Sequence, residues 1–153
     1  MNRRLVIMRH AHSSRDAPNL QDHDRPLDSR GLRDAPSTAN EILRSGWKPD
    51  KILVSTSLRT TQTFDALGSE FSDLPREFVS GLYLAPIQVL LSISRDLDDD
   101  STTMIIGHNP GCEMLLESLT GNLQVMPTAS AALIREEGDS WNLINFIRPK
   151  DLI

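Results

Sequence analysis

Cationic and imidazole side chains follow three separate apolar segments of the chain. Arg9 and His10 come directly after the apolar run at 5–8, Arg59 lies in "STSLRTTQT" behind a second run, and His108 closes a third in "IIGHNPG". Arginine offers paired donors to phosphate oxygens, and a neutral imidazole can act as a nucleophile. If the fold brings these side chains together, they form an anion pocket with a candidate nucleophile.

Short β-rich runs alternate with segments that have helical spacing. Strands are predicted at 4–8, 51–55, 76–80 and 102–108, and helices at 31–46, 57–71, 86–97 and 111–121. Residues 130–147 predict a hairpin that turns at Glu137, Gly138 and Asp139. The alternation predicts a three-layer α/β/α fold: a mostly parallel open sheet with helices on both faces and the antiparallel hairpin at one edge.

Particular residues set the expected helix ends and faces. Pro36 predicts a late start or a kink in the helix at 31–46, and Ser57 is the expected N-cap of the next helix. Pro86 opens the third helix, and Gly121 ends the fourth. The apolar face expected for the first helix consists of Leu32, Ala35, Ala39, Ile42 and Leu43.

The predicted strand ends are the natural place for a ligand. In open α/β sheets, ligands bind beyond the carboxyl ends of the strands. Three of those ends carry polar pairs, namely Arg9 with His10, Ser57 with Arg59, and His108 with Asn109. Arginines, imidazoles and helix N-termini directed at one spot make an anion pocket.

Simpler readings exist for the individual pieces. "GHNPG" alone is typical of a turn, and His10 with His12 could be a metal pair, although no neighbouring third ligand completes it. His12 is expected at the pocket rim, and His23, between two aspartates, in a solvated loop. The co-occurrence of the pieces at equivalent strand ends favours the pocket.

Composition sets outer limits. The 153 residues fit one domain, 1–153, and the net charge of -5 with mixed signs argues against a nucleic-acid partner. The single cysteine, Cys112, has no partner for an internal disulfide and is expected to be a small apolar core residue. No apolar run approaches the length of a membrane span or forms a signal peptide, so a cytoplasmic location is predicted.

The sequence resembles the histidine phosphatase superfamily. The superfamily signature is a strand that ends in Arg-His-Gly, a second arginine in a Ser-x-x-x-Arg-x-x-Gln-Thr helix start, and a late strand that ends in Gly-His. Here the segments are "MRHA", "STSLRTTQT" and "IIGHNPG". Within the superfamily, the short length, "DHDRPLDSRGLRDA" and "GLYLAP" are similar to the small SixA-type bacterial phosphohistidine phosphatases, and the "RPL…G" element is the most specific of these features.

This resemblance implies a phosphoglycerate mutase-like fold and hydrolysis of a phosphohistidine on a protein, namely a histidine phosphotransfer domain, without a metal or other cofactor. It implies that His10 is the nucleophile and that Arg9, Arg59 and His108 bind the phosphoryl group. The residue chemistry agrees, because a neutral imidazole can attack phosphorus, while two arginines and a protonated His108 would stabilise charge on the oxygens.

Two positions depart from the superfamily pattern. Ala11 replaces the usual glycine, and a methyl group is tolerated there only if the backbone does not need a positive φ. The glutamate general acid of many members is absent from "VSGLYLAP". A phosphorylated imidazole can leave without such an acid, which favours N–P over O–P substrates, although Asp22, Asp24, Glu77 or Glu113 could still serve as the acid.

Two other functions stay open at this point. The first is a phosphatase that acts on a small phosphoester metabolite. The second is a module that binds a phosphoprotein without turnover, and the intact His10 argues against it because binding alone needs no nucleophile.

Overall fold

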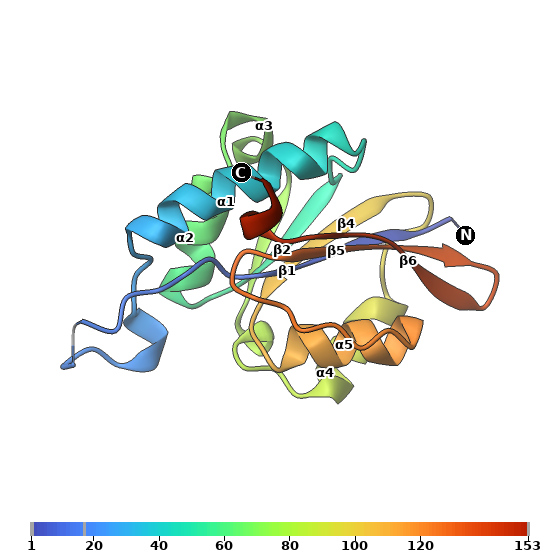
Figure 1. Cartoon of the computed structure of the whole chain (residues 1–153). Coiled ribbons are helices and arrows are strands. Elements are labelled where there is room, and N and C mark those ends of the chain that lie inside the picture. The colour runs from blue at the N-terminus through green and yellow to red at the C-terminus, as the bar shows by residue number, and fades with distance from the viewer. Residues whose placement is uncertain (1, 17, 153) are drawn as a thin grey trace.

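A six-stranded sheet forms the centre of the molecule (Figure 1). The structure is a computed structural model that describes residues 2–16 and 18–152. Its strands are β1 (Arg4–Arg9), β2 (Lys51–Ser55), β3 (Arg76–Val79), β4 (Thr102–Gly107), β5 (Ala131–Glu137) and β6 (Ser140–Ile147). Their order is β3-β2-β4-β1-β5-β6, with β1 to β4 parallel and β5 and β6 antiparallel at one edge. The predicted sheet is confirmed.

Helices cover both faces of this sheet, as predicted. They are α1 (Ser29–Arg44), α2 (Leu58–Ala66), α3 (Ser69–Ser72), α4 (Ile87–Arg95) and α5 (Gly111–Thr120). Figure 1 shows α1, α2 and α3 above the sheet and α4 and α5 below it. Every helix within the described ranges is too short or too polar to cross a bilayer.

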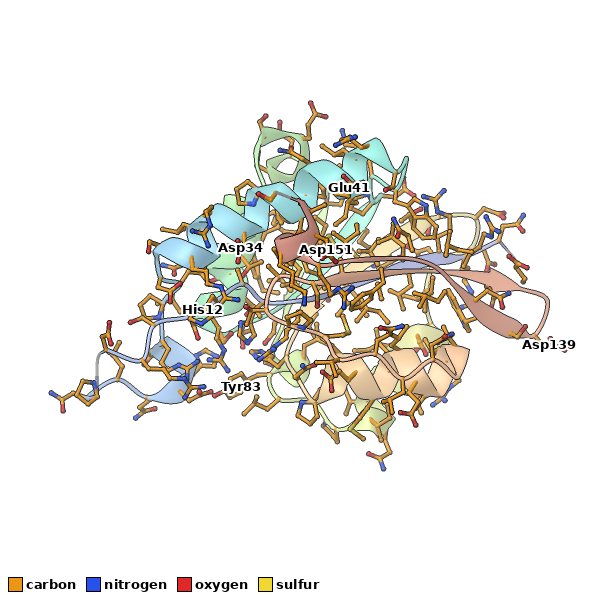
Figure 2. The ribbon with its side chains drawn as sticks, viewed as in Figure 1. His12, Asp34, Glu41, Tyr83, Asp139 and Asp151 are labelled. Atoms are coloured by element: carbon orange, nitrogen blue, oxygen red, sulfur yellow. The ribbon has the colours of Figure 1, made fainter. Side chains whose placement is uncertain are left out.

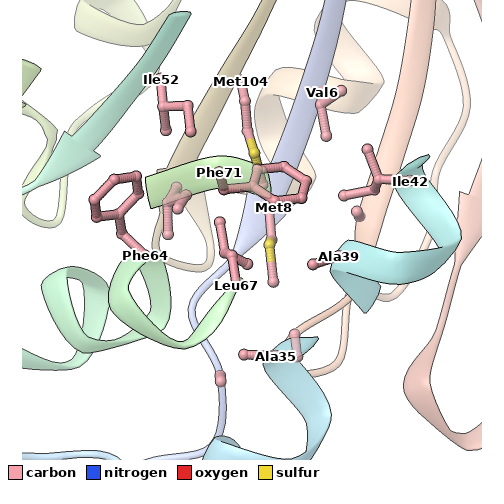
Figure 3. Packing of buried hydrophobic residues seen from close by; sticks show 14 of the residues in the cluster. Val6, Met8, Ala35, Ala39, Ile42, Ile52, Phe64, Leu67, Phe71 and Met104 are labelled. Carbon is pink, nitrogen blue, oxygen red and sulfur yellow. The ribbon is translucent and has the colours of Figure 1, made fainter. Parts of the chain in front are cut away.

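Strand β1 is buried on both faces, which explains its unbroken apolar run. Val6 and Met8 point into the cluster beneath α1, α2 and α3, which Figure 3 shows from close by. Leu5 and Ile7 point into the cluster on the α4 and α5 side. That second cluster also contains Cys112, buried with Leu115 and Leu116, which confirms the apolar role expected for the cysteine.

Helix α1 begins earlier than predicted and has a narrower apolar face. The Asp28 carboxylate caps it by accepting a hydrogen bond from the Gly31 N–H at 3.0 Å, so the helix starts at Ser29 and Pro36 lies inside it. A late start at Pro36 was therefore the wrong prediction, because a capped N-terminus outweighs the one hydrogen bond that proline removes. Leu32 is 56% exposed, since it lies in the first turn at the edge of the apolar face.

Other helix ends follow the predictions, with one break. Ser57 caps α2 by accepting from the Thr60 N–H, and α5 ends at Gly121 with φ +76°. Pro86 is the N-cap of α4. The helix predicted over 57–71 is two helices, α2 and α3, because Gly68 adopts φ +110°, which interrupts the helical backbone.

The start of α1 is clamped onto the segment that follows β1. The Asp28 N–H donates to the His12 carbonyl at 3.2 Å, and the His12 Nδ1 lies 2.5 Å from the Asp28 carboxylate. Ser13 and Leu27 form an isolated antiparallel bridge beside them. A Cβ on Gly31 would lie 2.2 Å from the His12 carbonyl oxygen, so only glycine permits this approach.

We expect Gly31→Ala to destabilise the protein by about 1–3 kcal/mol, because the methyl group collides with backbone rather than with a flexible side chain. The matched control is Gly81→Ala, where an added Cβ would meet nothing within 4 Å. Urea unfolding of both variants measures the difference. Equal stability of the two variants would show that α1 moves away at no cost.

Candidate active site

The carboxyl ends of β1 and β4 bring two imidazoles together. Arg9 pairs with Gly107 in the parallel register, so the next residues, His10 and His108, are neighbours with ring centroids 5.4 Å apart. The Arg59 guanidinium, from the start of α2, has its Nη2 3.3 Å from the His108 Nδ1. The structure therefore brings all four predicted site residues to one edge of the sheet.

These residues line a pocket of about 270 Å³ that is rich in cations. Figure 2 labels His12, which lines it, and Tyr83, at the end of the molecule where β1 finishes. Besides the four predicted residues, the lining comprises His12, Ser13, Arg15, Asp22, Arg25, Leu84, Asn109 and Thr128. Four arginines thus face one carboxylate among the described lining residues.

His10 has one ring nitrogen committed to the backbone. Its Nδ1 lies 2.7 Å from the Ala11 carbonyl oxygen, and because a carbonyl only accepts, Nδ1 carries the proton. Nε2 has no hydrogen-bond partner among the described residues. Burial lowers the pKa of His10 to about 3, and the cations Arg59 and Arg9 add to this effect. The ring is therefore neutral with a lone pair on Nε2, which is the nucleophilic form.

Ala11 fits the site without strain. It is fully buried, its N–H donates to the Thr63 Oγ1 at 2.9 Å, and it is not among the residues with positive φ. The methyl group in place of the superfamily glycine therefore does not force a left-handed backbone.

Three pocket arginines are anchored at one end and keep an unused donor. Arg9 donates from Nη1 to the Met126 carbonyl at 3.0 Å, Arg25 from Nη2 to the Ser13 Oγ at 2.5 Å, and Arg59 from Nη1 to the Asp22 carbonyl at 2.7 Å. The buried Nε of each has no partner in the described part of the chain. The same is true of Arg4 outside the pocket, so the charge of the three guanidiniums that line the pocket, rather than their Nε atoms, makes it suit an anion.

His108 is neutral in this pocket, unlike the protonated form expected from the sequence. A guanidinium only donates, so the His108 Nδ1 accepts from Arg59 and its Nε2–H donates to the Ser55 Oγ at 2.8 Å. Burial, and then the charge of Arg59, lower the pKa of His108 to about 4, although Asp22 acts in the opposite direction. The positive charge of the pocket therefore comes from arginines.

Asp22, in the short 3-10 turn η1 (Asp22–Asp24), is a carboxylate held in its ionised form. Its Oδ2 accepts from the Tyr83 hydroxyl at 2.5 Å and from the Arg59 Nη2 at 3.0 Å. The hydrogen bond from Tyr83, together with Arg59 and Arg25, lowers the pKa of Asp22 against the effect of burial. An ionised carboxylate cannot donate a proton.

The other three carboxylates considered as acids lie outside the pocket. Glu113 accepts from the Asn109 Nδ2 at 2.9 Å and from the Met126 N–H at 2.7 Å, and so holds two loops in place. Glu77, opposite Leu53 in β3, lines a separate hollow. Asp24 is exposed beside His23.

Sequence reasoning missed several residues at the rim. Arg15, Arg25 and Tyr83 lie at the site, and the "RPL" element that contains Arg25 was the available signal. His12 lies at the rim as predicted. His23 is more than a solvated loop residue, because its ring stands edge-on to that of Tyr83, with the ring centroids 4.7 Å apart.

Within residues 2–16 and 18–152, no group of three His, Cys, Asp or Glu side chains could hold a metal.

Comparisons with known proteins give the family. A model of the histidine phosphatase superfamily (branch 1) matches residues 5–83. An uncharacterized chloroplastic protein of Arabidopsis thaliana is 35% identical over 153 residues, which cover 92% of this chain and 70% of that protein. The chain belongs to the histidine phosphatase superfamily.

Solved structures place this phosphatase with the SixA type. A SixA protein of Agrobacterium tumefaciens is 29% identical, with a TM-score of 0.86 over 95% of this chain and 97% of that one. The protein histidine phosphatase SixA in complex with tungstate shares the fold, with 23% identity and a TM-score of 0.86 over 98% and 99% of the two chains. The phosphoglycerate mutase-like fold is confirmed. The plant relative shows that the similarity is not confined to bacteria, and the cytoplasmic location stays a prediction.

The two buried imidazoles predict a loss of stability in acid. Their pKa values, about 3 for His10 and about 4 for His108, lie below the ordinary 6.5, so the unfolded chain binds protons that the folded chain excludes. Stability is fully present above about pH 6.5 and falls as the pH drops, by about 3 kcal/mol for each histidine at pH 4.

Urea unfolding between pH 7 and pH 4 measures this effect. We expect His10→Gln and His108→Gln each to flatten the pH dependence. Leu84→Ala is the control, because Leu84 lines the same pocket without a titratable group, and it should retain the wild-type slope. An unchanged slope in both histidine variants would contradict the neutral assignment.

Proposed function

We propose that this phosphatase hydrolyses phosphohistidine on a protein, a histidine phosphotransfer domain, through a covalent phospho-His10 intermediate. The superfamily supports phosphoryl transfer to a histidine at this position. The observation that carries the choice of substrate is the state of Asp22, the one carboxylate among the described lining residues, which is ionised by Tyr83 and Arg59.

Arginines hold the phosphoryl group in this proposal. The guanidinium groups of Arg9, Arg25 and Arg59, which line the pocket, supply charge-assisted hydrogen bonds to its oxygens. Stabilising the charge on these oxygens is the main task in phosphoryl transfer, and donors that are already in position need no reorganisation. His108 takes part as a neutral partner that orients Arg59.

The first step forms the bond from His10 Nε2 to phosphorus and breaks the bond from phosphorus to the substrate imidazole. The substrate ring carries a proton on its other nitrogen and leaves as neutral imidazole. The Ala11 carbonyl, which accepts from His10 Nδ1–H, stabilises the positive charge that the phosphorylated ring acquires.

In the second step, water attacks the phosphorus and the electron pair of the P–N bond returns to His10 Nε2. Both protons of the water stay on the phosphate, which is released as the monoanion. Neither step asks the enzyme for a proton.

The proton balance separates the substrate classes. An alkoxide needs a proton donor to leave, whereas an imidazole that is already protonated does not. With Asp22 ionised and Glu77, Asp24 and Glu113 outside the pocket, the described lining residues include no carboxylic acid donor for an alkyl phosphoester. This favours phosphohistidine over a small phosphoester.

The intermediate can be trapped. Rapid quenching with a 32P-labelled phosphohistidine protein should leave base-stable, acid-labile label on His10, and His10→Ala should abolish both label and turnover. Label that persists in His10→Ala would place the nucleophile on another residue.

Arg59→Ala should lower kcat/KM by a factor equivalent to about 2–4 kcal/mol, since one preorganised donor is lost. Treatment with EDTA should leave the activity of the wild type unchanged.

Substrate choice is tested with a phosphohistidine peptide and an alkyl phosphate of matched charge. The peptide should be cleaved far faster. Asp22→Asn should lower both rates by the same factor, because it loosens Arg59 and removes no proton donor. Fast alkyl phosphate hydrolysis that falls about a hundredfold in Asp22→Asn alone would establish Asp22 as a general acid and favour the small-phosphoester function.

A further inference from the structure

A second hollow opens beside the candidate active site and is larger than the phosphate pocket. It has a volume of about 550 Å³ and lies between α1 and the C-terminal 3-10 turn η3 (Pro149–Leu152). Thr128 lines both this hollow and the His10 pocket, so the two are neighbours on the surface. Figure 2 labels Asp34 on α1 and Asp151 in the C-terminal turn, the two elements that border the hollow.

The charge of this hollow is opposite to that of the whole chain. Arg30, Arg33 and Lys150 line it, with Asp34 as the one acidic residue among the described lining residues, whereas the chain carries a net charge of -5. The Arg30 and Arg33 side chains are 53% and 73% exposed, and each lies 3.5 Å from the buried Asp34 carboxylate. Because Arg30 and Arg33 share one carboxylate, their positive charge is only partly neutralised, and the groove can bind a further anion.

One of the two arginines, Arg30, stands where a helix disfavours a cation. Arg30 lies in the first turn of α1, whose only nearby carboxylate before Asp34 is the Asp28 N-cap, and Arg33 lies in the second turn. The positive end of the helix dipole disfavours a cation at Arg30, so helix stability does not explain the arginine there. A local rule broken in this way is expected at functional or strained sites.

We propose that this cationic groove, defined by Arg30, Arg33, Lys150 and Thr128, docks an acidic segment of the phosphorylated partner protein beside its phosphohistidine. The inference rests on the proposed function and adds the charge of the partner surface. The groove, at about 550 Å³, is larger than a second phosphate alone requires, and Thr128 borders both it and the pocket, so one partner surface can reach both. Complementary exposed charges raise association and selectivity more than the rate of the chemical step.

The test uses three N-phosphoryl substrates: a phosphohistidine peptide with Asp and Glu flanks, the same peptide with Asn and Gln flanks, and N-phosphoryl imidazole. Arg33→Gln with Lys150→Gln should lower kcat/KM for the acidic peptide about fivefold through KM, with kcat unchanged. The loss should vanish in 0.5 M salt. The other two substrates should be unaffected.

The matched control is Arg135→Gln with Lys48→Gln, which removes the same charge outside the groove, from exposed side chains paired with Glu137 and Glu70. This control should leave all three substrates unchanged. A similar loss in the control, an equal loss on all substrates, or no loss would overturn the groove proposal. If the groove variant is instead inhibited less by pyrophosphate than the wild type is, and cleaves the acidic peptide normally, the groove binds a small polyanion. That result would also overturn the proposal.

Measurements on the wild-type protein alone distinguish a failure of the proposed function from a failure of the docking proposal. If wild-type protein cleaves none of the N-phosphoryl substrates but hydrolyses an alkyl phosphate, the phosphohistidine assignment falls and the docking proposal falls with it. Wild-type cleavage with no groove effect overturns only the docking proposal.

Discussion

The parallel pairing of β1 with β4 is the constraint on which the site depends. With Arg9 opposite Gly107, the residues that follow the two strands are both histidines, and their imidazole rings lie 5.4 Å apart. Helices bury both faces of these strands, so a one-residue slip in register would exchange side chains between two clusters that are packed for different residues. The distance between the two rings is therefore set by the core rather than by loops.

Burial then decides the chemistry of the pocket. Excluding water makes a charged imidazole costly, so His10 and His108 are neutral, while arginines keep their charge at any pH at which the protein is folded. Different residues therefore provide the nucleophile and the positive charge: the neutral imidazoles provide lone pairs, and the guanidinium groups provide the positive electrostatic potential that attracts an anion. Asp22 offsets part of this field and holds Arg59 in place.

The strands and the strand-end residues could be predicted from the sequence because apolar periodicity and strand ends are local signals. Arg9, His10, Arg59 and His108 all follow such signals. Arg15, Arg25 and Tyr83 could not be placed, since they stand on irregular segments whose path depends on tertiary contacts. The neutral state of His108 was also missed, because it depends on burial and on Arg59, which the sequence alone does not position. The same holds for the start of α1, where the Asp28 cap outweighed Pro36.

The bridge between Ser13 and Leu27 has a consequence for how the superfamily can diversify. The Ser14 N–H donates to the Pro26 carbonyl at 2.9 Å, so the loop leaves and returns at one point. Lengthening a loop whose ends already meet costs little entropy. Asp22 and Arg25 can therefore be exchanged by insertion or deletion while His10 keeps its position. Changes in this loop therefore alter the pocket wall at Asp22 and Arg25, while Arg9, His10 and His108 keep the positions that the strand ends give them.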